Sequence, residues 1–117
     1  MRVAILGSGS WATALAKIVM HNVPEINWYI RKQETIDEFI EIRRNPNHLE
    51  WAYFDISRIN FSADINAVVD QSDLIILAIP SPYIKQSLDD IKIDMSQKCV
   101  ISAVKGMIPA TKPWRRP

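Results

Sequence analysis

The sequence predicts an α/β protein with a doubly wound, mainly parallel β-sheet in a single domain. Short runs of continuous apolar residues, which are typical of strands buried on both faces, alternate along the chain with segments of helical periodicity. Strands that are separated by helices pair in parallel through right-handed crossovers. The length of 117 residues suffices for one domain with a buried core, but not for two.

The first strand and the first helix are predicted at the N-terminus. Residues 3–6 are all apolar and predict a buried strand. A helix is expected over residues 12–20, because apolar side chains recur there at spacings of three and four. These side chains are Ala12, Leu15, Ala16 and Val19. The alanines among them favour close packing of the helix on the sheet.

A second strand and a second helix are predicted at residues 26–30 and 34–44. The helix carries its acidic residues early and its arginines late, in agreement with the helix dipole. The side chains expected to face the core are Ile36, Phe39 and Ile40. Residues 48–58 have no clear periodicity and are interpreted as a packed loop.

The alternation continues in the C-terminal half. Residues 59–61 are predicted to form a short strand and residues 64–71 a short helix. The run 74–79 is the clearest buried strand of the chain, and it stops at Pro80.

One more helix and one more strand complete the pattern. Ser81 is expected to cap a helix that Pro82 begins and that runs to about residue 91. The last strand is predicted at residues 99–104. Cys99 is the only cysteine, so it cannot form an internal disulfide, and we expect it to be a small buried hydrophobic residue.

The segment Gly7-Ser8-Gly9-Ser10-Trp11-Ala12 lies between the first strand and the first helix. This is the G-x-G-x-x-A arrangement of a Rossmann-like dinucleotide-binding turn. Gly7 permits the tight turn, Gly9 lets the backbone approach a phosphate, and Ala12 lets the helix pack closely on the strand. The backbone N–H groups of the helix N-terminus then face the pyrophosphate. The sequence therefore predicts a site for NAD or NADP.

Two side chains of this turn are candidates for cofactor contact. Ser10 is interpreted either as a helix cap or as a residue whose hydroxyl and N–H bind a phosphate oxygen, and one residue can do both. Trp11 is a large aromatic residue at the first turn of a helix, which is an awkward choice for simple packing. We expect Trp11 to form part of the wall of the cofactor cleft.

Arg31 and Lys32 follow the second strand, where a fold of this kind usually places an acidic residue against the adenosine ribose 2′-hydroxyl. A guanidinium suits a 2′-phosphate there, because it donates charge-assisted hydrogen bonds in pairs. The alternative is that both residues are exposed cations at a strand end. The missing acid therefore indicates tolerance of NADP and leaves NAD open.

Two further candidates follow later strands at the same edge of the predicted sheet. Pro80 ends one strand, and its backbone is expected to contact the nicotinamide half of the cofactor. Lys105 follows the last strand and is the best candidate for contact with an anionic substrate, because it brings a fixed positive charge to the cleft. The alternative for Lys105 is a solvated lysine at a strand end.

Composition excludes several classes of function. The formal net charge of +1 gives no electrostatic case for binding nucleic acid. No apolar run approaches the length needed for membrane insertion, and Met1 and Arg2 lead directly into the first strand, so we expect a cytoplasmic protein. His21 and His48 have neither the spacing nor the companions of a metal site. No nucleophile with a partner base is visible.

Five motifs of the chain, taken together, point to a family. They are Gly7-Ser8-Gly9-Ser10-Trp11-Ala12-Thr13-Ala14-Leu15-Ala16, Trp28-Tyr29-Ile30-Arg31, Asn45-Pro46-Asn47-His48-Leu49, Ile79-Pro80-Ser81 and Val104-Lys105-Gly106. Over residues 2–108 the chain resembles the bacterial NAD(P)-dependent glycerol-3-phosphate dehydrogenases, in which this segment is the N-terminal Rossmann-like domain.

The resemblance implies roles for particular residues. It implies that Ser10 and Trp11 contact the pyrophosphate side of the cofactor and that Arg31 lies by the adenosine ribose. It implies that Lys105 contacts both the cofactor and glycerol phosphate. Asn45 and Leu49 match an Asn-x-x-x-Leu element that lies beside the cleft in the family.

The chain departs from the family pattern at three places. Ala12 replaces the usual glycine, and its methyl group still permits close packing. Pro82-Tyr83-Ile84 replaces the more usual His-Val-Phe after Pro-Ser. Ile108 stands where an acidic residue commonly follows Lys-Gly-x.

The resemblance also implies that two domains contribute to the reaction. The family transfers a hydride between nicotinamide and glycerol 3-phosphate or dihydroxyacetone phosphate, which supplies glycerophospholipid precursors, and a lysine of a C-terminal helical domain is the general acid or base. We expect residues 1–107 to be the NAD(P)-binding domain and residues 108–117 an unstructured or truncated tail. We expect the helical domain to be missing from these 117 residues, and we assign no catalytic residue here. The uncovered cleft face is expected to favour self-association, as in a homodimer.

Two other interpretations share the glycine turn. One is the N-terminal domain of a different dehydrogenase, such as a ketopantoate reductase or a hydroxyacid dehydrogenase, although these lack the combined Ser-Trp, Asn-x-x-x-Leu and Lys-Gly motifs. The other is a regulatory module that binds a dinucleotide without chemistry. Such a module would require the chain to end naturally at Pro117.

Overall fold

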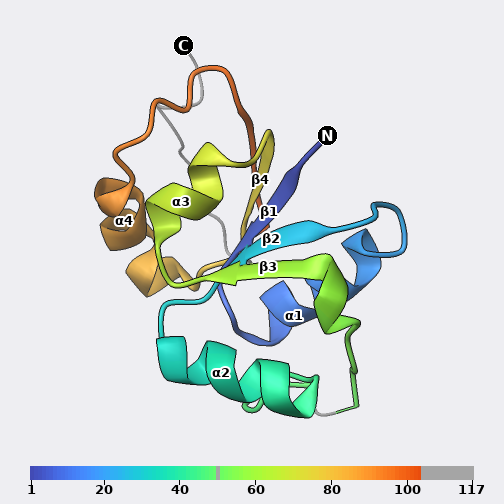
Figure 1. The fold of residues 1–117 in the computed structure, drawn as a ribbon. Helices are drawn as coiled ribbons and strands as arrows, with labels where there is room; N and C mark the ends of the chain where they lie inside the picture. The colour runs from blue at the N-terminus through green and yellow to red at the C-terminus, as the bar shows by residue number, and fades with distance from the viewer. Residues whose placement is uncertain (50, 104–117) are drawn as a thin grey trace.

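The structure of the chain is a computed structural model that describes residues 1–49 and 51–103 (Figure 1). Five strands form one sheet: β1 Val3–Leu6, β2 Ile26–Tyr29, β3 Ile59–Ser62, β4 Leu74–Leu77 and β5 Cys99–Ser102. The helices are α1 Ser10–Val19, α2 Gln33–Ile42, α3 Ile65–Asp70 and α4 Ser81–Asp90, and Ile56–Arg58 forms a 3₁₀ turn. The strand order is β3-β2-β1-β4-β5, and every neighbouring pair is parallel. The predicted doubly wound α/β fold is confirmed.

The sheet separates two apolar cores, with α1 and α2 on one face and α3 and α4 on the other (Figure 1). Successive residues of β1 alternate between them, because side chains of a strand point to opposite faces. Val3 and Ile5 enter the core under α1 and α2, whereas Ala4 and Leu6 enter the core under α3 and α4. The chain reverses its direction of winding between β1 and β4, and a sheet of this kind binds ligands at that point.

Trp28 of β2 is the centre of the core under α1 and α2. It is fully buried, and its ring centroid lies 5.2 Å from that of Phe39, 5.5 Å from that of Phe54 and 5.7 Å from that of Phe61. Phe54 belongs to the segment between α2 and β3, which was predicted to be a packed loop. The aromatic ring of Phe54 therefore anchors that loop to the sheet.

Two predicted core positions were wrong. Ile40 is 45% exposed, because α2 contacts the core mainly through Ile36 and Phe39. Cys99 is exposed rather than buried, because it begins β5, which lies at the edge of the sheet and pairs only with β4. Periodicity alone does not distinguish an edge strand from a central one.

The ends of several elements also differ from the prediction. Helix α2 stops at Ile42, since Arg43 adopts a left-handed conformation with φ of 62° and ends the helix. Helix α4 begins at Ser81, so its capping position is Pro80 rather than the predicted serine. Asp64, in contrast, caps α3 by accepting hydrogen bonds from the backbone N–H groups of Asn66 and Ala67.

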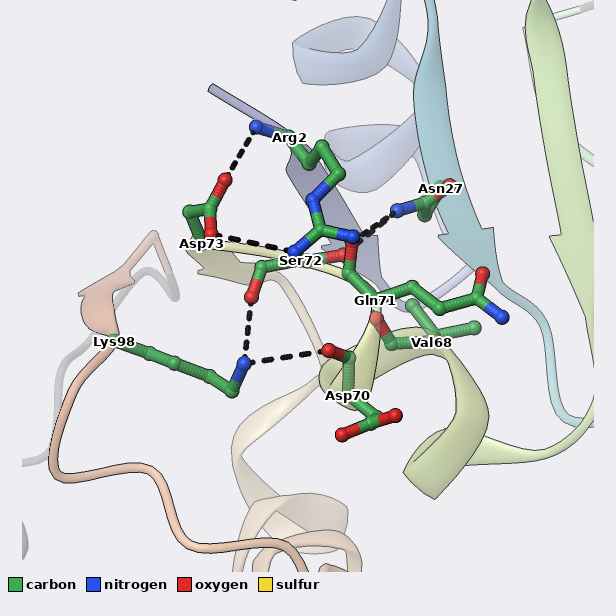
Figure 2. Close-up of polar contacts among 8 residues, drawn as sticks. All are labelled: Arg2, Asn27, Val68, Asp70, Gln71, Ser72, Asp73 and Lys98. Carbon is green, nitrogen blue, oxygen red and sulfur yellow. Dashed lines mark hydrogen bonds and ion pairs between the residues drawn. The ribbon is translucent and has the colours of Figure 1, made fainter.

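A polar network closes the edge of the sheet at which the strands begin (Figure 2). The side-chain amide of Asn27 donates to Ser72 Oγ at 2.8 Å, and Lys98 Nζ donates to the backbone oxygen of Ser72 at 2.8 Å. The backbone N–H of Arg2 donates to the carboxylate of Asp73 at 2.9 Å. These bonds tie α3, β1, β2 and the start of β5 together.

Asp73 should make the stability of the protein depend on acidic pH. The hydrogen bond from the Arg2 backbone, together with the nearby guanidinium, lowers the pKa of the Asp73 carboxyl below its ordinary value. A lowered folded-state pKa stabilises the protein above the unfolded pKa of about 3.9, and this stabilisation disappears as the pH falls through the folded-state pKa. We therefore expect Asp73→Asn to lower the urea midpoint at pH 7 and to have a smaller effect near pH 3.

The control for this measurement is Glu38→Gln, which removes an exposed carboxylate of α2 that has no partner among the described residues. Urea titrations at both pH values should show no such pH-dependent difference for Glu38→Gln. An equal loss for Asp73→Asn at both pH values would contradict the assignment.

Candidate dinucleotide-binding site

The turn after β1 requires glycine at its first position. Gly7 has φ of 125°, and a Cβ atom placed on it would lie 2.5 Å from the backbone oxygen of Ala78. Its N–H donates to the backbone oxygen of Tyr29 at 3.1 Å, and its carbonyl accepts from the buried indole N–H of Trp28 at 2.7 Å. The turn is therefore locked between β2 and β4, and the fold itself explains Gly7.

The fold does not explain Gly9 in the same way. Gly9 has an ordinary φ of −77°, and no atom of the described residues lies within 4 Å of the position that a Cβ would occupy. The protein alone could therefore accommodate a methyl group there. Glycine at this position instead leaves the backbone accessible to a ligand, as a dinucleotide pyrophosphate requires.

The backbone N–H groups of residues 8–12 are available to such a ligand. Among the described residues, none accepts a hydrogen bond from them. Gly9 is the N-cap of α1 and has no side chain to satisfy them. An α-helix N-terminus with open N–H groups and the positive end of the helix dipole binds anions.

A hollow of about 320 Å³ lies beside this turn at the edge where the strands end. Its walls come from the turn, from the ends of β2 and β4 and from α4. They consist of Gly7, Ser8, Tyr29, Arg31, Ile79, Pro80, Tyr83, Gln86, Ser87 and Asp90. The structure thus brings four residues of the predicted site together, namely Gly7, Ser8, Arg31 and Pro80.

A second hollow of about 410 Å³ lies at the opposite edge, between Arg2, Pro24 and Gln71. It is larger, but it lies where the strands begin. Ligands of open α/β sheets bind outside the carboxyl ends of the strands. We therefore take the smaller hollow as the candidate functional site.

Ser10 and Trp11 lie on the other flank of the turn. The Ser10 hydroxyl lies 3.1 Å from Nδ1 of His48, and because Gly9 occupies the capping position, Ser10 is not the helix cap. Trp11 is 55% exposed, and its indole N–H donates to the backbone oxygen of Ala103 just after β5. Trp11 therefore lies along the same edge of the sheet as the hollow, and its contact with a cofactor stays a prediction.

Of the remaining predicted residues, Ala12 and Lys32 do not line the hollow. Ala12 is fully buried and packs against the core, in agreement with close contact between α1 and the sheet. Lys32 is an exposed residue at the N-cap of α2 and does not border the hollow. Lys105, the predicted contact for substrate, lies outside the described residues.

Helix α4 contributes residues to the hollow that were not predicted from the sequence. Tyr83, Gln86, Ser87 and Asp90 line the hollow. They recur at spacings of three, one and three, which is one face of a helix, so a polar stripe was the signal that could have found them. Asp90, an acidic residue, thus lines the same hollow as Arg31.

Tyr29, at the end of β2, also lines the hollow and was not predicted. Burial raises the pKa of its phenol above the ordinary value, against the opposing influence of Arg31. Its hydroxyl is therefore neutral at physiological pH and remains a hydrogen-bond donor in the wall of the hollow.

Within residues 1–49 and 51–103, no group of three His, Cys, Asp or Glu side chains is arranged to hold a metal ion. In the same part of the chain, no helix is long and apolar enough to cross a membrane. The site consists of an anion-binding helix N-terminus beside a partly polar hollow. This fold and this site together define a dinucleotide-binding protein of the Rossmann type.

Comparison with known proteins identifies the family. The profile of the NAD-dependent glycerol-3-phosphate dehydrogenase N-terminus matches residues 2–114, so the chain belongs to this family. The curated glycerol-3-phosphate dehydrogenase [NAD(P)+] of Geobacillus kaustophilus is 32% identical over 110 residues, which cover 93% of this chain and 32% of that protein. The enzyme of the same name from Staphylococcus carnosus is 30% identical and is covered to 33%.

Solved structures agree with this assignment. Glycerol-3-phosphate dehydrogenase of Plasmodium falciparum superposes with a TM-score of 0.78 at 30% identity, over 94% of this chain and 34% of that one. The enzyme of Saccharomyces cerevisiae has the same fold, with a TM-score of 0.78 at 20% identity over 91% of this chain. The chain spans about a third of the length of these relatives.

Proposed function

We propose that this chain binds NAD or NADP as the coenzyme-binding domain of a glycerol-3-phosphate dehydrogenase. The observation that carries the proposal is the contrast between the two glycines of the turn. Gly7 is required by the fold, whereas Gly9 leaves space beside open N–H groups at the start of α1. Family membership supports the same coenzyme.

Each part of the coenzyme has candidate residues in the site. The N–H groups of residues 8–12 would hold the pyrophosphate, and the hollow beside α4 would hold the adenosine half. Arg31 suits a ribose 2′-phosphate, while Asp90 suits a free 2′-hydroxyl. Because both residues border one hollow, we propose that NADP and NAD are both accepted.

The nicotinamide half and the substrate belong to the other flank. We propose that Trp11 borders the nicotinamide there, and that the backbone of Pro80, which lines the hollow beside the turn, contacts the nicotinamide half from that side. Lys105 follows β5 in the sequence, and we propose that it contacts glycerol 3-phosphate or dihydroxyacetone phosphate. The coenzyme, when bound, supplies the hydride that interconverts these two compounds.

The proposal for the whole protein includes a division into domains. Residues 1–107 bind the coenzyme, and a further helical domain of the same protein supplies the general acid or base. No assigned catalytic residue lies in this chain, so we expect it to bind coenzyme without turnover. The whole protein would act in the cytoplasm, as a homodimer, in the supply of phospholipid precursors.

Coenzyme titration with a double variant tests the proposal. We expect NADH and NADPH to bind the wild-type chain, as measured by nicotinamide fluorescence and by quenching of tryptophan emission. Arg31→Ala combined with Lys32→Ala should weaken NADPH binding by about 10-fold to 100-fold, because charged hydrogen bonds to the 2′-phosphate are lost. NADH binding should change much less, since NADH has no such phosphate.

Lys85→Ala is the matched control for the lost positive charge. Lys85 is an exposed residue of α4 that pairs with Asp89, and it does not border the hollow. It should leave the affinity for both coenzymes unchanged. Undiminished NADPH affinity in the double variant would contradict the role of Arg31, and failure of the wild-type chain to bind either coenzyme would contradict the proposed function.

A further inference from the structure

Asn45, in the segment between α2 and β3, is hydrogen-bonded to the glycine turn and to α1. Its side chain is fully buried, and its amide nitrogen donates to the backbone oxygen of Ser8 and to the hydroxyl of Thr13, both at 2.9 Å. The amide oxygen accepts from the backbone N–H of Asn47 at 2.9 Å. Both amide protons and the amide oxygen are therefore used, and no other side chain of this size offers the same set.

Local features of the sequence bring Asn45 to this place. Arg43 ends α2 in a left-handed conformation, and Pro46 disfavours helical backbone at Asn45. The backbone oxygen of Arg43 then accepts from the N–H of Phe54 at 2.9 Å, and Phe54 is buried in the aromatic core. The loop is fixed by this hydrogen bond and by the buried ring of Phe54, so the side-chain amide of Asn45 is held next to the turn.

Thr13 extends this contact into α1. Its hydroxyl accepts from Asn45 and donates to the backbone oxygen of Gly9 at 2.7 Å. The carbonyl groups of Ser8 and Gly9 are thus held on the protein side of the turn by two buried side chains. The N–H groups that follow them are left for a ligand, since no described residue accepts from them.

We propose that Asn45 is a positioning residue, which acts through Thr13 and the carbonyl of Ser8 to keep the N–H groups of residues 8–12 aimed at the coenzyme pyrophosphate. This inference rests on the proposed coenzyme binding and adds a residue that does not itself touch the ligand. Buried hydrogen bonds of this kind fix backbone geometry, and preorganised donors bind anions more tightly than mobile ones.

A purely structural role would predict a different result, and Asn27 provides the matched comparison. Asn27 is also buried, and its amide nitrogen donates to Ser72 Oγ at 2.8 Å and to the backbone oxygen of Gln71 at 3.3 Å. Its amide oxygen accepts from Asn60 at 3.0 Å. The two asparagines therefore have the same pattern of bonds, but Asn27 lies at the opposite edge of the sheet (Figure 2).

The experiment compares Asn45→Asp with Asn27→Asp, since each removes two donated hydrogen bonds with no change in size, and it includes Thr13→Val, which adds no negative charge beside the turn. Both asparagine variants should lower the urea midpoint. Of these two, only Asn45→Asp should raise the Kd for NADH and NADPH, by about 10-fold, when measured where both proteins are folded. Backbone amide resonances of residues 8–12 should shift in Asn45→Asp and stay in place in Asn27→Asp.

Thr13→Val keeps the test decisive if Asn45→Asp does not fold. This variant retains the shape of the side chain and removes the hydroxyl that links Asn45 to Gly9, so it should also raise the Kd for both coenzymes. Wild-type affinity in Asn45→Asp or in Thr13→Val would overturn the positioning role. An equal loss of affinity in Asn27→Asp would do the same. If the wild-type chain binds neither coenzyme, the proposed function fails as well.

Discussion

We expect the Gly9→Ala protein to bind NADH and NADPH about 100-fold more weakly than the wild type while remaining folded. The added methyl group enters a space that no described residue occupies, so it strains nothing in the protein itself. It does hold a phosphate away from the N–H groups at the start of α1. The helix should lose about 1 kcal/mol, because alanine is a poorer N-cap than glycine.

Gly7→Ala, in contrast, should mainly lower the stability of the protein. Its methyl group would overlap the backbone oxygen of Ala78, and alanine disfavours a φ of 125°. We expect a loss of about 3 kcal/mol in the free energy of unfolding. Urea titration of both variants, followed by calorimetric titration of the folded proteins with NADH, separates the two effects. Near-normal coenzyme affinity in Gly9→Ala would show that the turn does not seat the pyrophosphate.

The largest effect on stability is expected from Trp28→Ala, at about 3 to 5 kcal/mol. Trp28 is fully buried and contacts three phenylalanine rings, so its removal leaves a large cavity in the core. Trp28→Phe should cost less, about 1 to 3 kcal/mol. It preserves aromatic packing but leaves the buried carbonyl of Gly7 without the indole donor.

Equilibrium denaturation in urea, followed by far-UV circular dichroism, measures these losses. Trp51→Phe is the control, because Trp51 is 71% exposed and its replacement should leave the midpoint unchanged. The indole N–H of Trp28 donates a hydrogen bond to the carbonyl of Gly7 in the glycine turn. Because Trp28→Phe removes this bond, it should also weaken coenzyme binding by the folded protein. A Trp28→Ala protein as stable as the wild type would contradict the central place of this residue in the core.

The order of strands and helices could be predicted from the sequence because it depends on local patterns. Residues 3–6 and 74–77 are continuous apolar runs, and the strands β1 and β4 lie there. The glycine turn was recognisable for the same reason, since its residues are adjacent in the chain. The exposure of Cys99 and Ile40 could not be predicted in this way, because it depends on which strand lies at the edge and how α2 sits on the core.

The same distinction between local pattern and tertiary packing applies to the candidate site. The sequence by itself determined a parallel α/β fold and a glycine turn suited to a dinucleotide, because both follow from residue spacing and backbone sterics. Only the tertiary structure decided that Asp90 shares a hollow with Arg31 and that Asn45 holds the carbonyl of Ser8. These residues lie 59 and 37 positions apart, respectively, and only the packing of α4 and of the α2–β3 loop brings them together.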